Sequence, residues 1–228
     1  MSESLATLLQ FADGLFPAGG FAHSFGLETY AQEGRVRTRA DLEAFVAAHL
    51  EGAAGPADGV AVALVSRLAA SEDVGATMAL DAQLDAMKLV PEFRAASAQM
   101  GRQTLRVAQA LGEDGFLTAL GRAVDEGRTP GHHPVAFGAA LGRASVAAED
   151  AVTAYLHSTA ALLVGAGLRL IALGQLDGQR VLAAMRPRIA RLATRAAAAT
   201  ADDMWSFHPG IELAGLRHPT LDMRLFRS

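Results

Sequence analysis

The chain has 228 residues, of which 51% are apolar and 19% charged, and its 20 basic and 24 acidic side chains leave a formal charge of −4. This composition supplies enough apolar surface for a folded core and lacks the low hydrophobicity and high net charge of a disordered chain. The weak negative charge argues against nucleic acid as a partner. The absence of cysteine excludes disulfides, thiolate nucleophiles and cysteine-bound metal centres.

The N-terminal residues give no sign of export. The segment MSESLATLLQFADGLF contains acidic residues and no basic stretch, so it does not resemble a signal peptide. The most apolar stretch, residues 158–173, is short for a membrane span and contains Arg169. We therefore expect a cytoplasmic protein with no membrane contact.

In chain order, the predicted elements are helices. From Asp41, apolar residues recur at helical spacing as far as Leu50, and Gly52 with Gly55-Pro56 is expected to end that helix. Further helices are expected over residues 60–70, 91–111, 116–126, 134–144, 149–174 and 180–202.

Residues 173–179, LGQLDGQ, are predicted to form a turn before the last long helix. The sequence contains no run of alternating strands, no Asn-Gly hairpin and no strand–helix alternation. The predicted fold class is therefore all-α, as a single compact domain of about ten helices over residues 1–228 with no significant sheet. No polar linker is long enough to indicate a second domain.

The stretch FPAGGFAHSFGLE, residues 16–28, invites three interpretations. A phosphate-binding loop is disfavoured because the glycines have the wrong spacing and no lysine follows them. Ala22-His23-Ser24-Phe25-Gly26 is one residue away from a nucleophile elbow, so a serine hydrolase centred on Ser24 is the alternative function, although no strand precedes it. The remaining interpretation is a structured loop that enters a helix.

Metal and cofactor sites are not predicted. His132 and His133 are adjacent, and neighbouring side chains on one element do not converge on one ion. The sequence has no HExxH motif and no histidine pair at helical spacing. We predict no catalytic residue, no metal ligand and no cofactor.

The C-terminal segment, residues 216–228, is unusual for a chain end. It combines leucine, phenylalanine and arginine, whereas chain ends are mostly polar and frayed. Such side chains suit an interface, so this tail is predicted to order on a partner. A tail folded onto its own core is the equally weighted alternative.

Four blocks together carry a family resemblance. They are FPAGGFAHSFGLETY at 16–30, QMGRQTLR at 99–106, HPVAFGAALG at 133–142, and LGQLDGQR at 173–180 with the terminal RLFRS at 224–228. In their order and spacing, the chain resembles the urease accessory protein F family, UreF, from Leu8 to Ser228.

The resemblance implies an all-α, homodimeric, non-enzymatic chaperone for nickel insertion into urease. It implies a complex with the D (or H) accessory protein and with the G accessory GTPase, which docks on apo-urease and regulates GTP hydrolysis. The tail residues implied to contact the D or H protein are Arg217, His218, Arg224, Leu225, Phe226, Arg227 and Ser228. The residues implied for the dimer surface or the GTPase side are Phe21, His23, Ser24, Gly26, Glu28, Tyr30, Gln99, Arg102, Gln175, Asp177, Gly178 and Gln179.

The tail departs from the family pattern. Pro219 follows His218, and Asp222-Met223 stand before Arg224. Proline lacks an amide donor and fixes φ, so a helix is not expected to continue undisturbed through Pro219. An arginine that accelerates the partner's GTP hydrolysis is a further hypothesis, with candidates Arg35, Arg102 and Arg180 left unranked.

Overall fold

A computed structural model describes residues 2–228, so Met1, the first residue of the predicted domain, lies outside the described residues. The α-helices are α1 (Ser2–Ala12), α2 (Leu27–Gln32), α3 (Arg39–His49), α4 (Val60–Ala70), α5 (Val74–Met87), α6 (Pro91–Leu111), α7 (Gly115–Asp125), α8 (His133–Arg143), α9 (Ala148–Leu170), α10 (Gln175–Ala198) and α11 (Pro209–Arg217). No strand occurs among residues 2–228. The predicted all-α class of about ten helices is confirmed.

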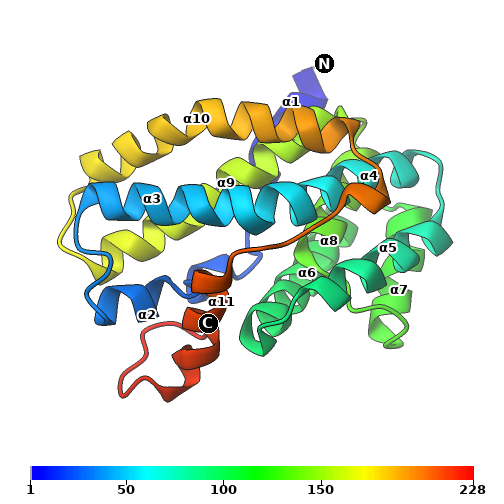
Figure 1. Cartoon of the computed structure of the whole chain (residues 1–228). Helices are drawn as coiled ribbons and strands as arrows, with labels where there is room; N and C mark the ends of the chain where they lie inside the picture. Colours follow the sequence, from blue (N-terminus) through cyan, green and yellow to red (C-terminus); the bar gives the residue numbers. More distant parts are fainter. Residues whose placement is uncertain (1) are drawn as a thin grey trace.

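Helix α9 is the centre of the molecule (Figure 1). It packs against α10 and α3 on one side and against α4, α8 and α1 on the others. Its buried side chains within residues 158–173 include Ala160, Leu163 and Val164. This burial accounts for the apolar character of residues 158–173. Among residues 2–228, α9 and the helical run Arg39–Ala70 are long and apolar enough to cross a membrane, but 56% and 61% of their most apolar windows are buried inside the fold.

The helix that begins at Arg39 does not end at Gly52 or Gly55-Pro56, so that prediction is wrong. Residues Leu50–Gly59 instead form a π-helix that joins α3 to α4. Pro56 lacks the amide proton that a regular α-helical ladder needs, and a π-helix has a different hydrogen-bond register. The glycines are required for packing: a Cβ on Gly55 would lie 2.8 Å from a methyl group of Leu192 on α10.

The predicted turn at residues 173–179 is also wrong, because α10 begins at Gln175 rather than Arg180. Gly174 is the extended residue before the helix, and Asp177 lies in the first helical turn, where a negative charge is favourable. Gly178 is buried against α9, where a Cβ would approach Val164 to 3.0 Å. The glycine that resembled a turn signal therefore marks a close contact between two helices.

Candidate functional site

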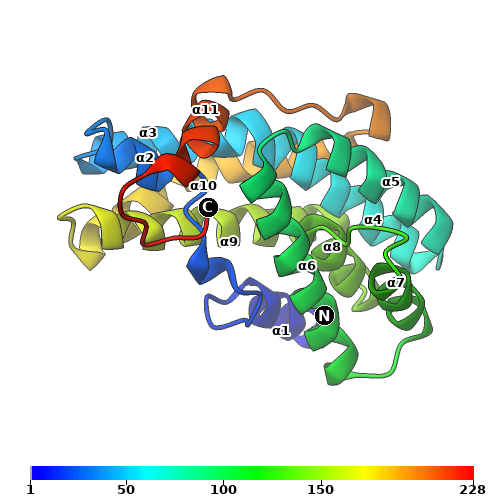
Figure 2. The ribbon, with the colours of Figure 1, turned by 90° about the horizontal axis from the view of Figure 1, so that it is seen from below.

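The C-terminal tail, residues 216–228, folds back onto the block at residues 16–30 (Figure 2). The main-chain oxygen of Ser228 accepts hydrogen bonds from the amides of Ser24 (2.6 Å) and Phe25 (3.1 Å). The Ser24 hydroxyl donates to the same oxygen at 2.8 Å. The Arg227 amide donates to the Ala22 carbonyl at 2.9 Å. The tail and the block at residues 16–30 are about two hundred positions apart in the sequence, yet they form one hydrogen-bonded structure, which we call the tail seat.

The backbone conformation of the block makes the tail seat possible. Phe25 and Gly26 have positive φ values of 49° and 86°. Glycine adopts this left-handed conformation without the steric cost of a Cβ. The resulting turn directs the amides of Ser24 and Phe25 toward Ser228, and it ends at α2, which begins at Leu27.

Glu28, in the first turn of α2, is the anchor of the tail seat. Its side chain is buried, with 1% exposure. One carboxylate oxygen accepts the Leu225 amide at 2.6 Å, and the other accepts the Phe226 amide at 3.1 Å. Hydrogen bonds to an ionised group are stronger than neutral ones, and they compensate for the burial of the charge.

His218 links the same carboxylate to a second helix. It is fully buried, with Nε2 2.9 Å from Glu28 Oε2 and Nδ1 2.7 Å from Glu92 Oε2. His218 therefore links α2 to α6 through the two glutamates, and Arg224 adds a contact with Glu92 at 3.1 Å.

Arg169 of α9 completes the tail seat. Its guanidinium carbon lies 3.7 Å from the ring centroid of Phe21 and 4.1 Å from that of Phe226. It also donates a 2.6 Å hydrogen bond to the Phe21 carbonyl. Burial lowers the pKa of Arg169 from its usual value, and the carboxylate of Glu28 opposes this change. Cation–π contacts of a partly desolvated arginine are stabilising, so the guanidinium connects the loop to the tail.

The structure places the predicted tail residues in two classes. His218, Phe226 and Ser228 are buried in the tail seat. The exposed residues are Arg217, Arg224, Leu225 and Arg227. The tail therefore folds onto its own chain, as the alternative expectation stated, and it still presents four side chains outward.

The residues predicted for the dimer surface or the GTPase side do not lie on one surface. His23, Ser24, Gly26 and Glu28 form the tail seat rather than an open surface, while Phe21 is 77% exposed at its edge. Tyr30 packs edge-on to Phe45, with ring centroids 5.2 Å apart, beneath the guanidinium of Arg35.

The other members of that set lie on α6 and at the start of α10. Gln99 and Arg102 are exposed on α6. At the start of α10, Gln175 and Gln179 are exposed, Gly178 is buried, and Asp177 lies 3.8 Å from Arg39.

Sequence reasoning missed Glu92 and Arg169. Glu92 follows Pro91 in the first turn of α6, where an acidic residue is ordinary and gives no functional signal. Arg169 carried a signal, because it is the one charge in the apolar stretch 158–173. A charge in that position needs a partner, and Phe21 and Phe226 provide it.

The serine hydrolase alternative is not supported. Ser24 is fully buried and its hydroxyl donates to Ser228, and no strand precedes it within residues 2–228. His23 Nδ1 lies 2.9 Å from the Ser228 hydroxyl. Burial, together with the charge of Arg227, lowers the pKa of His23 to about 4, so the ring is neutral at physiological pH. The pair thus fixes the tail in place.

The adjacent histidines diverge, as their spacing predicted. His132 Nε2 contacts Asp85 Oδ1 at 2.9 Å, whereas His133 packs against the rings of Phe137 and Tyr155. Within residues 2–228, no group of three or more histidine, aspartate or glutamate side chains is arranged to hold a metal ion.

Comparisons with known proteins agree with the family that the sequence resembles. A family model described as UreF matches residues 36–186. The "Urease accessory protein UreF" of Trichodesmium erythraeum (strain IMS101) is 32% identical over 99% of this chain and 97% of its own. The protein of that description from Thermosynechococcus vestitus is 34% identical over 99% and 98%. The one from Lachnoclostridium phytofermentans is 32% identical over the whole of both chains, so that match includes the tail.

Proposed function

Because the chain belongs to the UreF family of urease accessory proteins, we propose that it is a scaffold for urease maturation. It bridges the D (or H) accessory protein and the G accessory GTPase on apo-urease, so that nickel is inserted. It enters this cytoplasmic complex as a homodimer. The observation that carries the proposal is the tail seat, which holds exposed tail side chains on a buried, charged anchor.

The tail provides the contact with the D or H protein. Leu225 is 60% exposed and Met223 80% exposed, although the neighbouring Phe226 is buried. A segment that is already ordered loses less conformational entropy on binding than a disordered one. Exposed apolar and arginine side chains are typical of residues that dominate binding energy. In this proposal His218, Phe226 and Ser228 position the contact residues Arg217, Arg224, Leu225 and Arg227.

In this proposal the GTPase side includes the exposed residues of α6 and α10, and we order the arginine candidates by the contacts that each already makes. The Arg35 guanidinium lies 4.1 Å above the Tyr30 ring, and Arg180 lies 3.2 Å from Asp177. Arg102 is exposed and has no ion pair within residues 2–228. Arg102 is therefore the first arginine to replace in a GTP hydrolysis assay, with Arg106→Ala, four positions along the same helix, as the control.

The test is co-purification of this chain with the D and G accessory proteins, followed by light scattering. We expect a stable ternary complex of even stoichiometry. Leu225→Asp should abolish D binding, whereas Leu111→Asp, at a leucine that is 56% exposed at the end of α6, should leave it intact. A chain that binds neither partner would overturn the scaffold proposal. Normal D binding by Leu225→Asp would overturn only the assignment of the tail.

Truncation after Pro219 is a harsher version of this test. It should abolish D binding, but it also uncovers Glu28 and the other buried groups of the tail seat. Circular dichroism must therefore show that the truncated chain keeps its helices. Leu225→Asp avoids this difficulty because its side chain lies outside the tail seat.

A further inference from the structure

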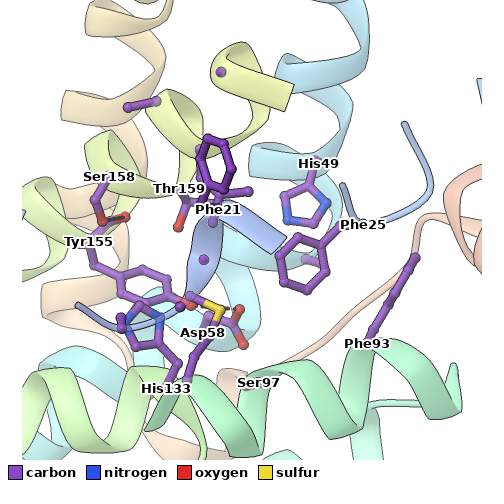
Figure 3. A pocket seen from close by; sticks show the side chains of 18 of the residues that line it. Phe21, Phe25, His49, Asp58, Phe93, Ser97, His133, Tyr155, Ser158 and Thr159 are labelled. Carbon is purple, nitrogen blue, oxygen red and sulfur yellow. Dashed lines mark hydrogen bonds between the residues drawn. The ribbon is translucent and has the colours of Figure 1, made fainter. Parts of the chain in front are cut away.

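A cavity of about 570 Å³ lies near the centre of the molecule, between the loop that precedes α2, the π-helix, α6 and α9 (Figure 3). Its walls are largely apolar and include Phe16, Phe25, Phe93, Met100 and Leu162. Small-molecule sites in proteins commonly have volumes of roughly 300–1,000 Å³ and apolar walls with a few polar groups. The size and the lining both fit this class.

Two oppositely charged residues of the cavity wall, Asp58 and Lys88, are paired with each other. Asp58 Oδ1 lies 2.8 Å from Nζ of Lys88, and Tyr155 donates a 3.0 Å hydrogen bond to Asp58 Oδ2. Burial raises the pKa of Asp58, but Lys88 and Tyr155 outweigh it, so the pKa is lowered overall and the carboxylate stays ionised. Burial lowers the pKa of His49 to about 3 and that of His133 to about 4. The pair of Asp58 and Lys88 is neutral as a whole, so this part of the wall favours an uncharged ligand, because a charged one would lose its hydration without a counterion. The other charged residues of the lining are Asp13, Arg169 and Glu212, and Glu212 lies 3.2 Å from His208 Nδ1.

Four residues of the cavity wall have a buried polar atom that forms no hydrogen bond with any protein group in the described residues: His49 Nδ1, Ser97 Oγ, Arg169 Nε and His208 Nδ1. The Arg169 guanidinium contacts the rings of Phe21 and Phe226, and His208 Nδ1 lies 3.2 Å from Glu212, which leaves His49 and Ser97. Their side chains are only 8% and 6% exposed, and both line the cavity. Buried polar atoms are nearly always hydrogen-bonded, since leaving one unpaired is costly. They are the polar groups that a bound molecule would satisfy.

One wall of the cavity is the π-helix Leu50–Gly59, which contributes Ala53, Ala57 and Asp58. π-helical turns are rare and often occur at functional sites. The small alanine side chains keep this wall open. At the mouth, Phe21 and Leu89 are 77% and 71% exposed, which gives an apolar entrance.

We propose that this cavity is a binding site for a small, uncharged molecule with a flat apolar body and one hydrogen-bonding group. The aromatic and aliphatic walls hold the body, and His49 or Ser97 binds the polar group. The cavity adjoins the tail seat, because Phe21, Phe25 and Arg169 border both. Its occupancy is measured on this chain alone, without the proposed partners.

The test uses indole and indene as probes, because the two have the same shape but only indole has an N–H donor. Binding to the full chain is measured by ligand-observed NMR. Lys88 is the only lysine of the chain and lines the cavity, so its rate of modification by an amine reagent gives a second readout. We expect millimolar or tighter binding, protection of Lys88, and an indole preference of about three- to tenfold, as one hydrogen bond provides.

Two sets of variants test whether the probes bind in this cavity and which polar groups they contact. His49→Phe combined with Ser97→Ala should abolish the preference for indole while indene still binds. Gly165→Leu places a side chain in open space at an exposed position of the lining and should weaken binding of both probes. Gly115→Leu, also in open space but in the first turn of α7, is the matched control.

The proposal is overturned if neither probe binds at millimolar concentration. It is overturned equally if Gly165→Leu binds both probes as well as Gly115→Leu does. A preference that persists in the His49→Phe, Ser97→Ala variant would overturn the role given to these two polar groups. Each of these outcomes is independent of the co-purification result.

Discussion

In the block at residues 133–142, Gly138 and Gly142 face the main chain of α4, where a Cβ on Gly138 would lie 2.7 Å from the Val62 carbonyl oxygen. In the block at residues 16–30, Gly26 instead turns the chain so that amides face the tail. Both blocks contain glycine and phenylalanine, and each contains a histidine whose pKa burial lowers to about 4. One block holds two core helices together, whereas the other holds the C-terminal tail. Two blocks of similar composition therefore have different roles: one forms the close contact between α8 and α4, which we call the rigid contact, and the other forms the tail seat.

The largest expected effect is at the rigid contact. A Cβ on Gly142 would lie 2.8 Å from the Cα of Ser66, which is main chain and cannot rotate away. Gly142→Ala should therefore lower the free energy of unfolding by about 4 kcal/mol, measured by urea titration. Gly115→Ala, where a Cβ meets nothing within 4 Å, is the control. A variant as stable as the control would show that α8 can move away from α4.

A smaller and more local effect is expected at the tail seat. Glu28→Gln removes the charge that binds His218 and two tail amides. It should destabilise the tail by about 2 kcal/mol, because hydrogen bonds to a buried charge are lost. Hydrogen exchange at Leu225 and Phe226 should accelerate about 30-fold, while the amides of α8 keep their protection. Equal acceleration in α8 would show that the tail is part of the cooperative core.

The sequence was sufficient to predict the fold class, because helical periodicity is a local pattern. The periodic apolar residues from Asp41 correctly indicated a helix, but the glycines after Leu50 were misinterpreted as its end. Whether a glycine ends a helix or packs against another one depends on tertiary contacts such as that of Gly55 with Leu192. Local sequence does not contain that information.

The tail seat could not be predicted from the sequence, for a different reason. The block and the tail were each identified as unusual, but as two separate surfaces. Glu28 and His218 are 190 positions apart, and nothing in either segment specifies that they meet. Only the packing of α2, α6 and α9 brings them together, and the same packing gives Glu92 and Arg169 their roles.

The dependence of stability on pH allows the two blocks to be compared through His23 and His133. The folded pKa values of His23 and His133 are about 4, below the ordinary value of 6.5, so the unfolded chain binds more protons between these values. Stability should be constant above pH 6.5 and fall as the pH decreases toward 4. At pH 5.5 each histidine should account for about 1 kcal/mol of the loss.

Replacing one histidine tests this expectation. His23→Gln and His133→Phe should each reduce the difference in unfolding free energy between pH 7 and pH 5.5 by about 1 kcal/mol. If His23→Gln leaves this difference unchanged while His133→Phe reduces it, the tail has already left its seat before the core unfolds. That result would separate the two blocks thermodynamically.

The smallest effect on stability is expected at the outer surface of the tail. Arg224 is exposed and lies 3.1 Å from Glu92, and exposed ion pairs contribute roughly 0–1 kcal/mol. Arg224→Gln should therefore leave the urea midpoint nearly unchanged and the tail amides protected. If the tail is the D-binding surface, however, the same substitution should weaken D binding more than Arg94→Gln, which removes a guanidinium paired with Asp85 on α5. Equal affinities for the two variants would restrict the role of Arg224 to its contact with Glu92. Weaker binding at unchanged stability would separate the residues that hold the tail from those that the partner contacts.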